Sequence, residues 1–420
     1  MKHKSYSQYK PSGVEWLGAV PEHWDVKRAR FMVAMNPTKQ EINHLPPETE
    51  VQFLPMESVS EDGSLNLETT RPIFEVSSGY TYFAEGDVTF AKITPCFENG
   101  KGAIMRNLQN SFGFGTTELT VIRPGPSLNN EYLYYLTISR DFRKNGEAWM
   151  YGAGGQKRVP DDFVREFRLA FPPLPEQQAI ASFLDVEMGR IDTLIGKKQR
   201  FVELLKEKRT ALISSVVTKG LNPKVKMKPS CVEWLGDVPD HWEIKRLKYV
   251  VRMKSGEGIT SEEIQESDEY PVYGGNGLRG YFSDFTHNGH YVLIGRQGAL
   301  CGNINYGKGN FWASEHAVVA EPVKPIATLW LGELLRIMNL NQYSVSAAQP
   351  GLAIDKIKEL IIPLPPFIEQ QAIADFLDSE TWSIDTLVAK VESAVEKLKE
   401  YRTALISAAV TGKIDVREAV

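Results

Sequence analysis

Residues Pro11–Arg28 read PSGVEWLGAVPEHWDVKR, and the pattern returns at Pro229–Arg246 as PSCVEWLGDVPDHWEIKR. The two stretches, called the heads below, agree at 13 of 18 positions. Similar segments separated by a long, fixed spacing indicate a duplicated structural unit. The chain is therefore expected to be built twice on one plan.

A second pair of similar segments lies at a different spacing. Glu176–Gly220 and Glu369–Lys413 share 28 of 45 residues, including Glu-Gln-Gln-Ala-Ile-Ala and Arg-Thr-Ala-Leu-Ile-Ser. The heads repeat after 218 residues and these tails after 193, so the first middle segment is 25 residues longer than the second. The middles themselves have diverged almost beyond recognition. The plan is a constant head, a variable middle and a constant tail, written twice.

Each tail has the pattern of one long helix. The proline-rich stretches 171–175 and 363–367 precede the tails and suit a helix start. Alternate steps of four and three residues then follow an apolar seam along each tail. The seam residues are Leu184, Ile191, Ile195, Val202, Leu205 and Leu212 in the first tail, and Ile384, Val388, Val395, Leu398 and Leu405 in the second.

A helix of about 40 residues is a rod of roughly 60 Å, and alone it has nowhere to bury such a seam. Two related helices can pair as an antiparallel coiled coil, which would carry the two middles to opposite ends. The alternative is that each helix packs only on its own domain. Arg209 and Arg402 interrupt the seam at the same step. They either set the register of the pair or extend out of the seam into solvent, and the second interpretation is slightly favoured.

The middles have mixed patterns. Short β-type runs separated by Gly and Asn turns are expected at 83–93, 118–122, 291–294 and 317–320, and helical spacing occurs at 131–143 and 326–340. Two correspondences between the middles survive: Lys92 with Arg296, and Thr117-Glu118 with Ser314-Glu315. The predicted fold class is α+β, with two mixed α/β domains joined by two long, antiparallel helices in a pseudo-twofold internal repeat.

Composition bounds the class of protein. The chain has 420 residues, enough for two or three domains, with 42% hydrophobic and 24% charged residues. It contains no apolar run long enough for a membrane span and no signal-peptide core at its start. Three widely spaced cysteines predict a reduced, cytoplasmic protein without a zinc site, in which the cysteines are small core residues. The net charge of −5 argues mildly against nucleic-acid binding. Local basic clusters such as 27–30 and 245–248 are, however, offset by acidic segments elsewhere and do not appear in the total.

Catalytic patterns are missing or explained by structure. The Pro-Pro strings at 171–174 and 364–367 lack the polar residue of an amine-methyltransferase loop and are interpreted as helix entries. Gly302–Gly309 resembles a phosphate-binding loop but has Gly309 where a Ser or Thr would hold magnesium, and is interpreted as a turn; the glycine-rich 273–280 is interpreted likewise. His23 and His241 stand beside tryptophans in the heads, where packing is favoured over catalysis. No catalytic or metal-binding residue is predicted.

Recognition remains as the function. Arg, Lys, Asn and Gln side chains read base edges, and glycines allow a backbone to approach a groove closely. The candidate DNA-binding residues are Lys92, Thr94, Asn99, Lys101, Gln156, Lys157 and Arg158 in the first middle, and Arg279, Arg296, Gln297, Asn303 and Lys308 in the second. The alternative for each is a solvated turn residue.

The repeated Val-Glu-Trp-Leu-Gly-x-Val-Pro-x-His-Trp heads and Glu-Gln-Gln-Ala-Ile tails resemble the specificity (S) subunits of type I restriction-modification systems over essentially the whole chain. The resemblance implies that 29–170 and 247–362 are target recognition domains, each for one half of a split double-stranded DNA site. It implies that 176–217 and 369–411 form an antiparallel spacer that docks two modification (methyltransferase) subunits, with restriction subunits where present. S-adenosylmethionine, ATP and magnesium are then expected in the partner subunits and no cofactor in this chain.

The expected domains are 1–170, a first target recognition domain with its head at 11–28; 171–220, a first spacer helix; 221–362, a second recognition domain with its head at 229–246; 363–413, a second spacer helix; and 414–420, a tail. Two other functions stay open: an adaptor that joins proteins through its coiled coil, and an enzyme with an unrecognised site.

Overall fold

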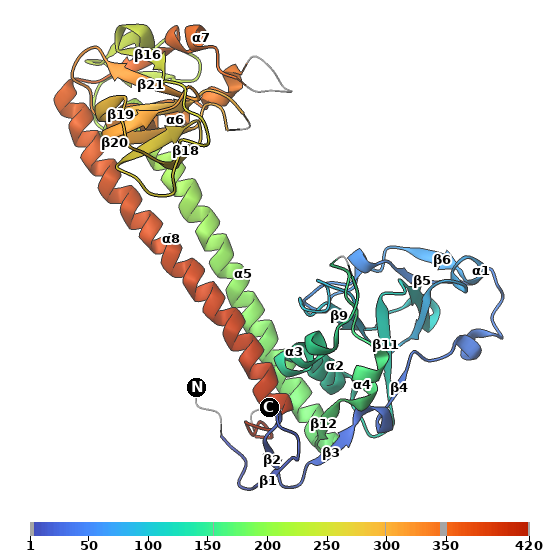
Figure 1. Cartoon of the computed structure of the whole chain (residues 1–420). Helices are drawn as coiled ribbons and strands as arrows, with labels where there is room; N and C mark the ends of the chain where they lie inside the picture. Colours follow the sequence, from blue (N-terminus) through green and yellow to red (C-terminus); the bar gives the residue numbers. More distant parts are fainter. Residues whose placement is uncertain (1–3, 154, 299, 345–350, 419–420) are drawn as a thin grey trace. The chain divides into compact units, whose positions relative to one another are not determined.

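The computed structural model describes residues 4–153, 155–298, 300–344 and 351–418 (Figure 1). The chain divides into two compact units. Unit 1 comprises Met1–Lys197 with Ser393–Val420, and unit 2 comprises Lys198–Glu392. Two long helices, α5 (Leu174–Lys219) and α8 (Phe367–Val410), each begin in one unit and end in the other. Each unit therefore combines one head, one middle and half of each long helix.

Both long helices begin at their proline-rich entries, as predicted. A glutamine of the repeated Glu-Gln-Gln fixes each start: Gln177 Nε2 donates to the Pro172 carbonyl oxygen at 2.9 Å, and Gln370 Nε2 donates to that of Pro365 at 2.9 Å. The side-chain oxygens of the same two glutamines accept backbone N–H groups from the middles, at Asn129 in unit 1 and Ala327 in unit 2. Each glutamine thus connects a helix start to the middle of its own unit.

The two long helices pair in antiparallel fashion within each unit, as expected (Figure 1). In unit 2, Arg209 of α5 binds Asp385 of α8, and Lys206, one turn earlier, binds Glu392, further along α8. In unit 1, Arg402 of α8 forms an ion pair with Asp192 of α5. Both interrupting arginines therefore bind across the helix pair. The aspartates are about half exposed, so each arginine leaves the apolar seam, as the slightly favoured interpretation expected, and also binds across the pair at its edge.

The seam residues lie between the helices or against the domains. Leu184, Ile191, Val202, Leu205, Ile384, Val395 and Leu405 are buried, and Ile195, Leu212, Val388 and Leu398 are partly buried. In unit 1 the seam is continuous with a core that includes Trp24 of the head and Tyr132 of the middle. In unit 2 it is continuous with a core that includes Trp242 and Trp330. Both alternatives for the helices are thus realised together: they pair, and their outer ends also pack on their own domains.

The described part of unit 1 contains small sheets and four α-helices besides the long ones. Two ribbons involve the head: β1 (Tyr9–Pro11) pairs with β2 (Ala19–Pro21), and β3 (Asp25–Arg28) pairs with β12 (Arg168–Phe171), which directly precedes the entry to the first tail. One four-stranded sheet has the order β4 (Val33–Met35), β11 (Leu119–Pro124), β8 (Val88–Ala91), β9 (Gly102–Ile104); the other has the order β6 (Thr70–Pro72), β5 (Glu50–Leu54), β10 (Phe112–Gly115), β7 (Thr81–Ala84). The short helix α1 is Ile73–Val76, and the helices α2 (Asn130–Ile138), α3 (Arg140–Trp149) and α4 (Asp161–Glu166) lie between β11 and β12 in the chain.

Unit 2 repeats the ribbons and gathers the rest into one sheet. The ribbons are β13 (Met227–Pro229) with β14 (Asp237–Pro239), and β15 (Glu243–Arg246) with β22 (Ile361–Leu364). The six-stranded sheet has the order β16 (Val251–Ser255), β21 (Ala317–Pro322), β19 (His287–Gly295), β20 (Ile304–Ala313), β17 (Tyr270–Gly274), β18 (Gly277–Phe282). Helix α6 (Thr328–Ile337) packs on β19 and β20, and α7 is Ile354–Lys358.

The two middles share a four-stranded order despite their sequences. The order β4–β11–β8–β9 in unit 1 corresponds to β16–β21–β19–β20 in unit 2, and all of these neighbours are antiparallel. The predicted α+β class with an internal repeat is therefore confirmed. The additional strands differ, because unit 1 builds a separate sheet from β5, β6, β7 and β10 whereas unit 2 extends its sheet with β17 and β18.

Several local predictions were wrong. The run 83–93 is two strands, β7 and β8, because Gly86 adopts a positive φ of 85° between them. The helical run 131–143 breaks at Ser139, whose side chain caps α3. Gly302–Gly309 is not a turn throughout: from Ile304 onward it forms strand β20, paired with β19. The glycine-rich 273–280, in contrast, contains the turn between β17 and β18.

The cysteines also depart from expectation, since Cys301 is buried but Cys96 is half-buried and Cys231 is exposed. In the described part of the chain, no helix combines the length and apolarity that crossing a membrane requires.

Candidate nucleic-acid interface

The candidate site of unit 1 is built where β8 ends and β11 begins. These strands are antiparallel, with Leu119 opposite Ala91, so the next residues outward, Lys92 and Glu118, face each other. The backbone N–H of Lys92 donates to the Glu118 carbonyl oxygen at 2.8 Å. The Lys92 carbonyl oxygen accepts from the N–H of Val159 at 2.9 Å, which brings the segment 151–158 to the same edge.

An ion pair closes this segment onto the strand end. Arg158 binds Glu118 in a bidentate contact, with Nε donating to Oε2 at 2.9 Å and Nη2 to Oε1 at 2.7 Å, and Nε also lies 3.2 Å from Oε1. The hydrogen bonds from Arg158 hold the pKa of the Glu118 carboxyl below its usual value. Arg158 is therefore committed to a bidentate contact inside the protein, and Glu118 stays charged beside Lys92.

Thr94 joins the other side of the segment. Its hydroxyl donates to the Gly155 carbonyl oxygen at 2.7 Å and accepts from the Lys157 N–H at 3.0 Å. Gln156 and Lys157 are exposed at the tip that these bonds hold. The structure thus brings Lys92, Thr94 and the three residues 156–158 together, with Thr94 and Arg158 in positioning contacts and Gln156 and Lys157 turned to the surface.

Asn99 and Lys101 belong to the neighbouring turn. Asn99 Nδ2 donates to Glu61 Oε1 at 2.9 Å, and Lys101 Nζ donates to the Met56 carbonyl oxygen at 2.9 Å. Both side chains hold the 56–61 segment against this turn. Their donors are engaged within the protein, which favours a structural role for them.

Unit 2 repeats the strand-end geometry. Ala317 of β21 lies opposite Gly295 of β19. The N–H of Arg296 donates to the His316 carbonyl oxygen at 2.9 Å, and the Arg296 carbonyl oxygen accepts from the N–H of Leu352 at 2.9 Å. These are the same bonds that Lys92 makes in unit 1. The predicted correspondence of Lys92 with Arg296 therefore agrees with the geometry.

The second predicted correspondence is displaced by one residue. Thr116 Oγ1 accepts the N–H of Glu118 at 3.3 Å, and Ser314 Oγ accepts the N–H of His316 at 3.3 Å. Thr116 therefore matches Ser314, and Glu118 matches His316 rather than Glu315. The sequence misled here because two threonines, at 116 and 117, precede Glu118.

The side chains around Arg296 differ from those around Lys92. Arg296 Nη1 lies 3.2 Å from Ser255 Oγ, at the end of β16. Gln297 is exposed and pairs through its backbone with Gly351. Because Leu352 matches Val159, Gly351 occupies the position of Arg158, so no arginine binds His316 from that position. The two strand ends share a backbone frame and carry different chemical groups.

The hairpin β17–β18 contributes a third element in unit 2. A Cβ placed on Gly275 would lie 3.0 Å from the His316 carbonyl oxygen, so glycine permits the hairpin tip to pack here. Asn303 Nδ2 donates to Asn276 Oδ1 at 3.3 Å, which joins Asn303 to the tip. Arg279 lies on β18, with its side chain against Gly274.

Lys308 is separate from this group. It lies opposite His290 in the β19–β20 ladder, whereas the ladder reaches the strand end at Ile294 and Ile304. The four residue steps from Ile304 to Lys308 span about 13 Å. The structure thus gathers Arg296, Gln297 and Asn303 near one strand end and leaves Lys308 further along the sheet.

Sequence reasoning missed two residues of these edges. His316 occupies the position that matches Glu118, and Tyr151, with 68% of its surface exposed, pairs through its backbone with Arg158. Tyr151 directly precedes a glycine-rich stretch, which is the one sequence signal that marks it.

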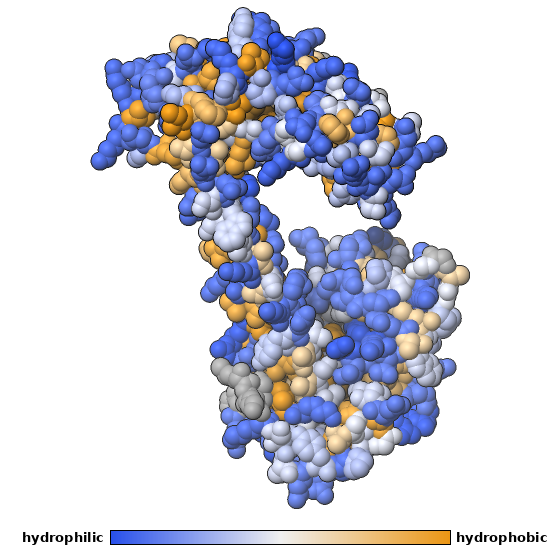
Figure 2. Space-filling view, turned by 60° about the vertical axis from the view of Figure 1, so that its left-hand side comes forward, coloured by the Kyte–Doolittle hydropathy of each residue, from blue (hydrophilic) through white to orange (hydrophobic). Residues whose placement is uncertain are grey.

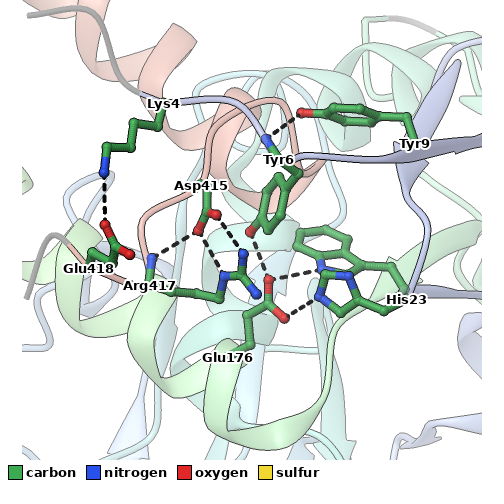
Figure 3. Close-up of polar contacts among 9 residues, drawn as sticks. Lys4, Tyr6, Tyr9, His23, Glu176, Asp415, Arg417 and Glu418 are labelled. Atoms are coloured by element: carbon green, nitrogen blue, oxygen red, sulfur yellow. Dashed lines mark hydrogen bonds and ion pairs between the residues drawn. The ribbon is translucent and has the colours of Figure 1, made fainter.

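The heads form a different kind of cluster. In unit 1, Glu176 at the start of α5 accepts from Tyr6 Oη at 2.8 Å and from Trp24 Nε1 at 3.0 Å, and contacts His23 Nε2 at 2.7 Å (Figure 3). Burial and the bond to Glu176 raise the pKa of Tyr6. The Arg417 guanidinium lies 5.1 Å from the Tyr6 ring centroid.

Unit 2 has a similar cluster, and the position that matches Tyr6 is a lysine, Lys224. Glu369 lies 2.8 Å from His241 Nε2 and 3.0 Å from Trp242 Nε1. Each histidine and tryptophan therefore anchors a head to a helix start. These contacts favour the packing role that the sequence suggested for His23 and His241.

Comparison with known proteins decides the family. The family described as "Type I restriction modification DNA specificity domain" matches residues 42–200 and 239–397, once in each half of the chain. The chain belongs to this family. The predicted resemblance to type I specificity subunits is therefore confirmed, and each match covers most or all of one middle and the first part of its tail.

Individual specificity subunits are similar over different lengths. The EcoprrI specificity subunit of Escherichia coli is 46% identical over 158 residues, which is 36% of this chain and 39% of that protein. The EcoAI specificity subunit of Escherichia coli is 43% identical over 38% of this chain and 27% of that protein. These segments span well under half of either relative. The putative MjaX specificity subunit of Methanocaldococcus jannaschii is 23% identical over 96% of both chains.

Solved specificity-subunit structures have the same fold. The HsdS subunit from Thermoanaerobacter tengcongensis aligns over 94% of this chain and 98% of its own, with a TM-score of 0.61 and 18% identity. A chain from a study of complex assembly and conformational transition of the type I R-M system aligns over 93% and 98%, with a TM-score of 0.77 and 17% identity.

Proposed function

We propose that this specificity subunit is a non-catalytic DNA reader that recognises a bipartite double-stranded site, one half with each unit. The observation that carries the proposal is the repeated strand end: Lys92 and Arg296 occupy one backbone frame in two domains whose neighbouring side chains differ. A shared frame with different donors and acceptors suits two readers of two different base sequences.

In unit 1 the reading edge would consist of Lys92, Gln156 and Lys157, with Glu118 and Arg158 holding the segment in place. In unit 2 it would consist of Arg296, Gln297 and Asn303, with His316 beside them. Arginine and lysine donate to guanine O6 and N7, and glutamine and asparagine pair with adenine, so these residues can form base-edge contacts. Further phosphate contacts would come from partner subunits, because the chain itself has a net charge of −5.

We further propose that two modification (methyltransferase) subunits dock on the long helices. Exposed apolar side chains support this: Val186, Leu194, Phe201 and Leu204 on α5, and Trp382, Leu387 and Tyr401 on α8. Apolar residues are visible as orange surface on the helices in Figure 2. Leu194 and Leu387 are equivalent in the repeat, 43% and 40% exposed, and each offers the same contact in its own unit.

A groove in unit 1 offers a further docking place. It has a volume of about 830 Å³ and is lined by Trp16 and Leu17 of the head and by α8 residues that include Ala404 and Ala408. Small residues on a helix allow a second helix to approach it closely, so a helix of a modification subunit would fit here.

Methyl transfer from S-adenosylmethionine would then occur in the modification subunits, and ATP- and magnesium-dependent cleavage in restriction subunits where these accompany the complex. The complex would work in the cytoplasm, on double-stranded DNA and away from membranes. This chain would determine which DNA sequence is recognised and would hold the other subunits together.

The decisive experiment exchanges one middle. Residues 29–170 are replaced by the corresponding segment of another specificity subunit, the chain is assembled with its modification subunits, and methylated motifs are mapped by long-read sequencing. One half of the methylated motif should change while the other stays. An adaptor that only joins proteins predicts an unchanged motif, and methyl transfer by the isolated chain would show an enzyme instead.

A further inference from the structure

Each unit exposes one large aromatic side chain at the same turn. Phe31 ends the 3₁₀ turn Ala29–Phe31 after β3, and Tyr249 ends the 3₁₀ turn Leu247–Tyr249 after β15. They are 69% and 63% exposed. The two residues stand 218 apart, which is the spacing of the heads. A single exposed aromatic means little, but the same exposure at the same turn in both copies requires an explanation.

The turns are rigid and built alike. In unit 1 the N–H of Ala29 donates to the Phe167 carbonyl oxygen at 2.9 Å, and that of Met32 to Ala29 at 2.8 Å. In unit 2 the N–H of Leu247 donates to Leu360 at 2.8 Å, and that of Val250 to Leu247 at 2.9 Å. Ala29 and Leu247 are buried. Each aromatic ring is therefore presented on a fixed support, which lowers the entropy cost of binding.

The charges around the two rings also match. In unit 1, Glu166 binds both Arg28 and Arg30, and the Arg30 guanidinium lies 5.0 Å from the Phe31 ring centroid. In unit 2, Glu359 binds both Arg246 and Lys248, at 2.6 and 2.7 Å. The Lys248 ammonium lies 5.4 Å from the Tyr249 ring centroid. The same set of two cations, one carboxylate and one aromatic ring thus survives in both copies, although the middles have diverged.

The position of the turns argues against contact with the proposed DNA edge. In unit 1, Glu118 directly precedes the first residue of β11. The last residue of β11, Pro124, lies at the other end and pairs with Val33, which is two residues beyond Phe31. In unit 2 the last residue of β21, Pro322, pairs with Val251, two residues beyond Tyr249. Six residues of strand span about 20 Å. The rings therefore lie at the opposite strand end from Lys92 and Arg296.

The local charge also favours a protein over a phosphate backbone. Two cations share one carboxylate at each turn, and the adjacent Lys27 and Lys245 bind Asp25 and Glu243. Phosphate binding relies on cations that are free to contact phosphates, and here each of these cations is already bound to a carboxylate. An aromatic ring beside an arginine or lysine is the composition of an anchor in a protein–protein interface.

We propose that Phe31 and Tyr249 are equivalent anchors, each of which inserts into an apolar pocket of one modification subunit. The inference rests on the proposed function, because a partner that binds in two copies is what a duplicated anchor fits. The contact of each ring adds to docking on the long helices. It gives each unit its own binding site for one modification subunit.

The test measures assembly of the full chain with the modification subunit of the same system. Native mass spectrometry and titration calorimetry give the number of copies bound and their affinities for wild type, Phe31→Ala, Tyr249→Ala and the double variant. Each single variant should weaken one of two binding events by about ten- to a hundredfold, as truncation of an interface anchor does. The double variant should weaken both.

Two kinds of control keep the result clear. Phe31→Tyr and Tyr249→Phe should bind as wild type, because the two copies already use either ring. Phe74→Ala and Leu278→Ala remove side chains of similar exposure, 59% and 54%, away from the turns and should leave both affinities unchanged. Unfolding midpoints of the isolated chains should agree within a few degrees, which shows that the variants are folded.

Unchanged affinity of the double variant, in a complex that still methylates a bipartite site, would overturn this inference and leave the proposed function intact. Loss of DNA affinity with normal subunit binding would overturn it in favour of a DNA contact. Failure of the wild-type chain to bind the modification subunit at all would overturn both.

Discussion

Arg209 of α5 makes a bidentate ion pair with Asp385 of α8, with Nε 2.9 Å from Oδ1 and Nη2 3.2 Å from Oδ2. Arg402 and Asp192 form the equivalent pair in unit 1, with Nε 3.5 Å from Oδ1. Each helix therefore supplies one arginine and one aspartate, 193 residues from their counterparts. Such self-complementary polar contacts favour the antiparallel register over shifted ones.

Reversing one charge in unit 2 should destabilise the helix pair, and reversing both should restore it. Arg209→Asp places two carboxylates together and is expected to cost about 1 kcal/mol, since the pair is partly exposed and screened by solvent. The midpoint of thermal unfolding should then fall by about 2–4 °C. The double variant Arg209→Asp/Asp385→Arg should recover most of this loss, and high salt should reduce the difference. If the double variant is no more stable than Arg209→Asp or Asp385→Arg alone, the ion pair between the helices is contradicted.

The head clusters predict an asymmetry between the units. Glu176 is 7% exposed and serves three donors, whereas the side chain of Glu369 is 27% exposed and serves two. Glu176→Ala leaves buried donors without an acceptor and is expected to lower the free energy of unfolding by about 2–3 kcal/mol. Glu369→Ala is expected to lower it by about 1 kcal/mol. Denaturant unfolding of the two variants measures the difference. Equal losses would mean that Tyr6 and the deeper burial contribute nothing.

The pair of Glu118 and Arg158 predicts a pH dependence. Because the folded state lowers the pKa of Glu118, the charged carboxylate stabilises the segment 151–158. That contribution is complete above the unfolded value of 4.5 and is lost as the pH falls through the lower folded value. Carboxyl NMR titration should show the pKa of Glu118 rising toward 4.5 in Arg158→Gln.

The same substitution should speed exchange of the Lys157 amide, which is bonded to Thr94. Arg165→Gln, at the end of α4, is a control that should leave both signals unchanged. A normal pKa of Glu118 in the wild-type chain would contradict the assignment.

Truncations at the strand ends should separate the two half-sites. Lys92→Ala should weaken recognition by the assembled complex at one half-site, and Arg296→Ala at the other, each by about 1–3 kcal/mol if a base contact is lost. Binding to duplexes with single-base changes measures the effect for each half. Lys308→Ala and Lys101→Ala are matched controls, because one residue lies further along its sheet and the other donates within the protein. If one substitution weakened base specificity equally at both half-sites, the proposal that each unit recognises one half-site would be contradicted.

The sequence predicted what repetition and periodicity encode. Two long helices, their seam and the correspondence of Lys92 with Arg296 follow from spacing. It could not predict that Arg209 meets an aspartate 176 residues away, or that Arg158 returns to Glu118 across 40 residues, because such pairs depend on tertiary geometry that leaves no local pattern. The exposure of Phe31 was equally hidden, since an aromatic after a strand is expected in a core.

The long helices make a final prediction about the gap between the half-sites. Each helix contributes to both units. Helix length is therefore expected to set the number of base pairs in the gap between the two half-sites. Seven residues, one heptad, are inserted after Phe201 in α5 and after Ala394 in α8, which are equivalent in the repeat and lie near the middle of the pair. A heptad preserves the seam and adds about 10 Å of helix. The insertion should shift the methylated motif to a longer gap, by about three base pairs, with both half-sites unchanged. A chain with the insertion in α5 alone is the control, because it breaks the seam register and should assemble poorly. If the doubly extended chain assembles and methylates the original gap, the helices do not set the spacing.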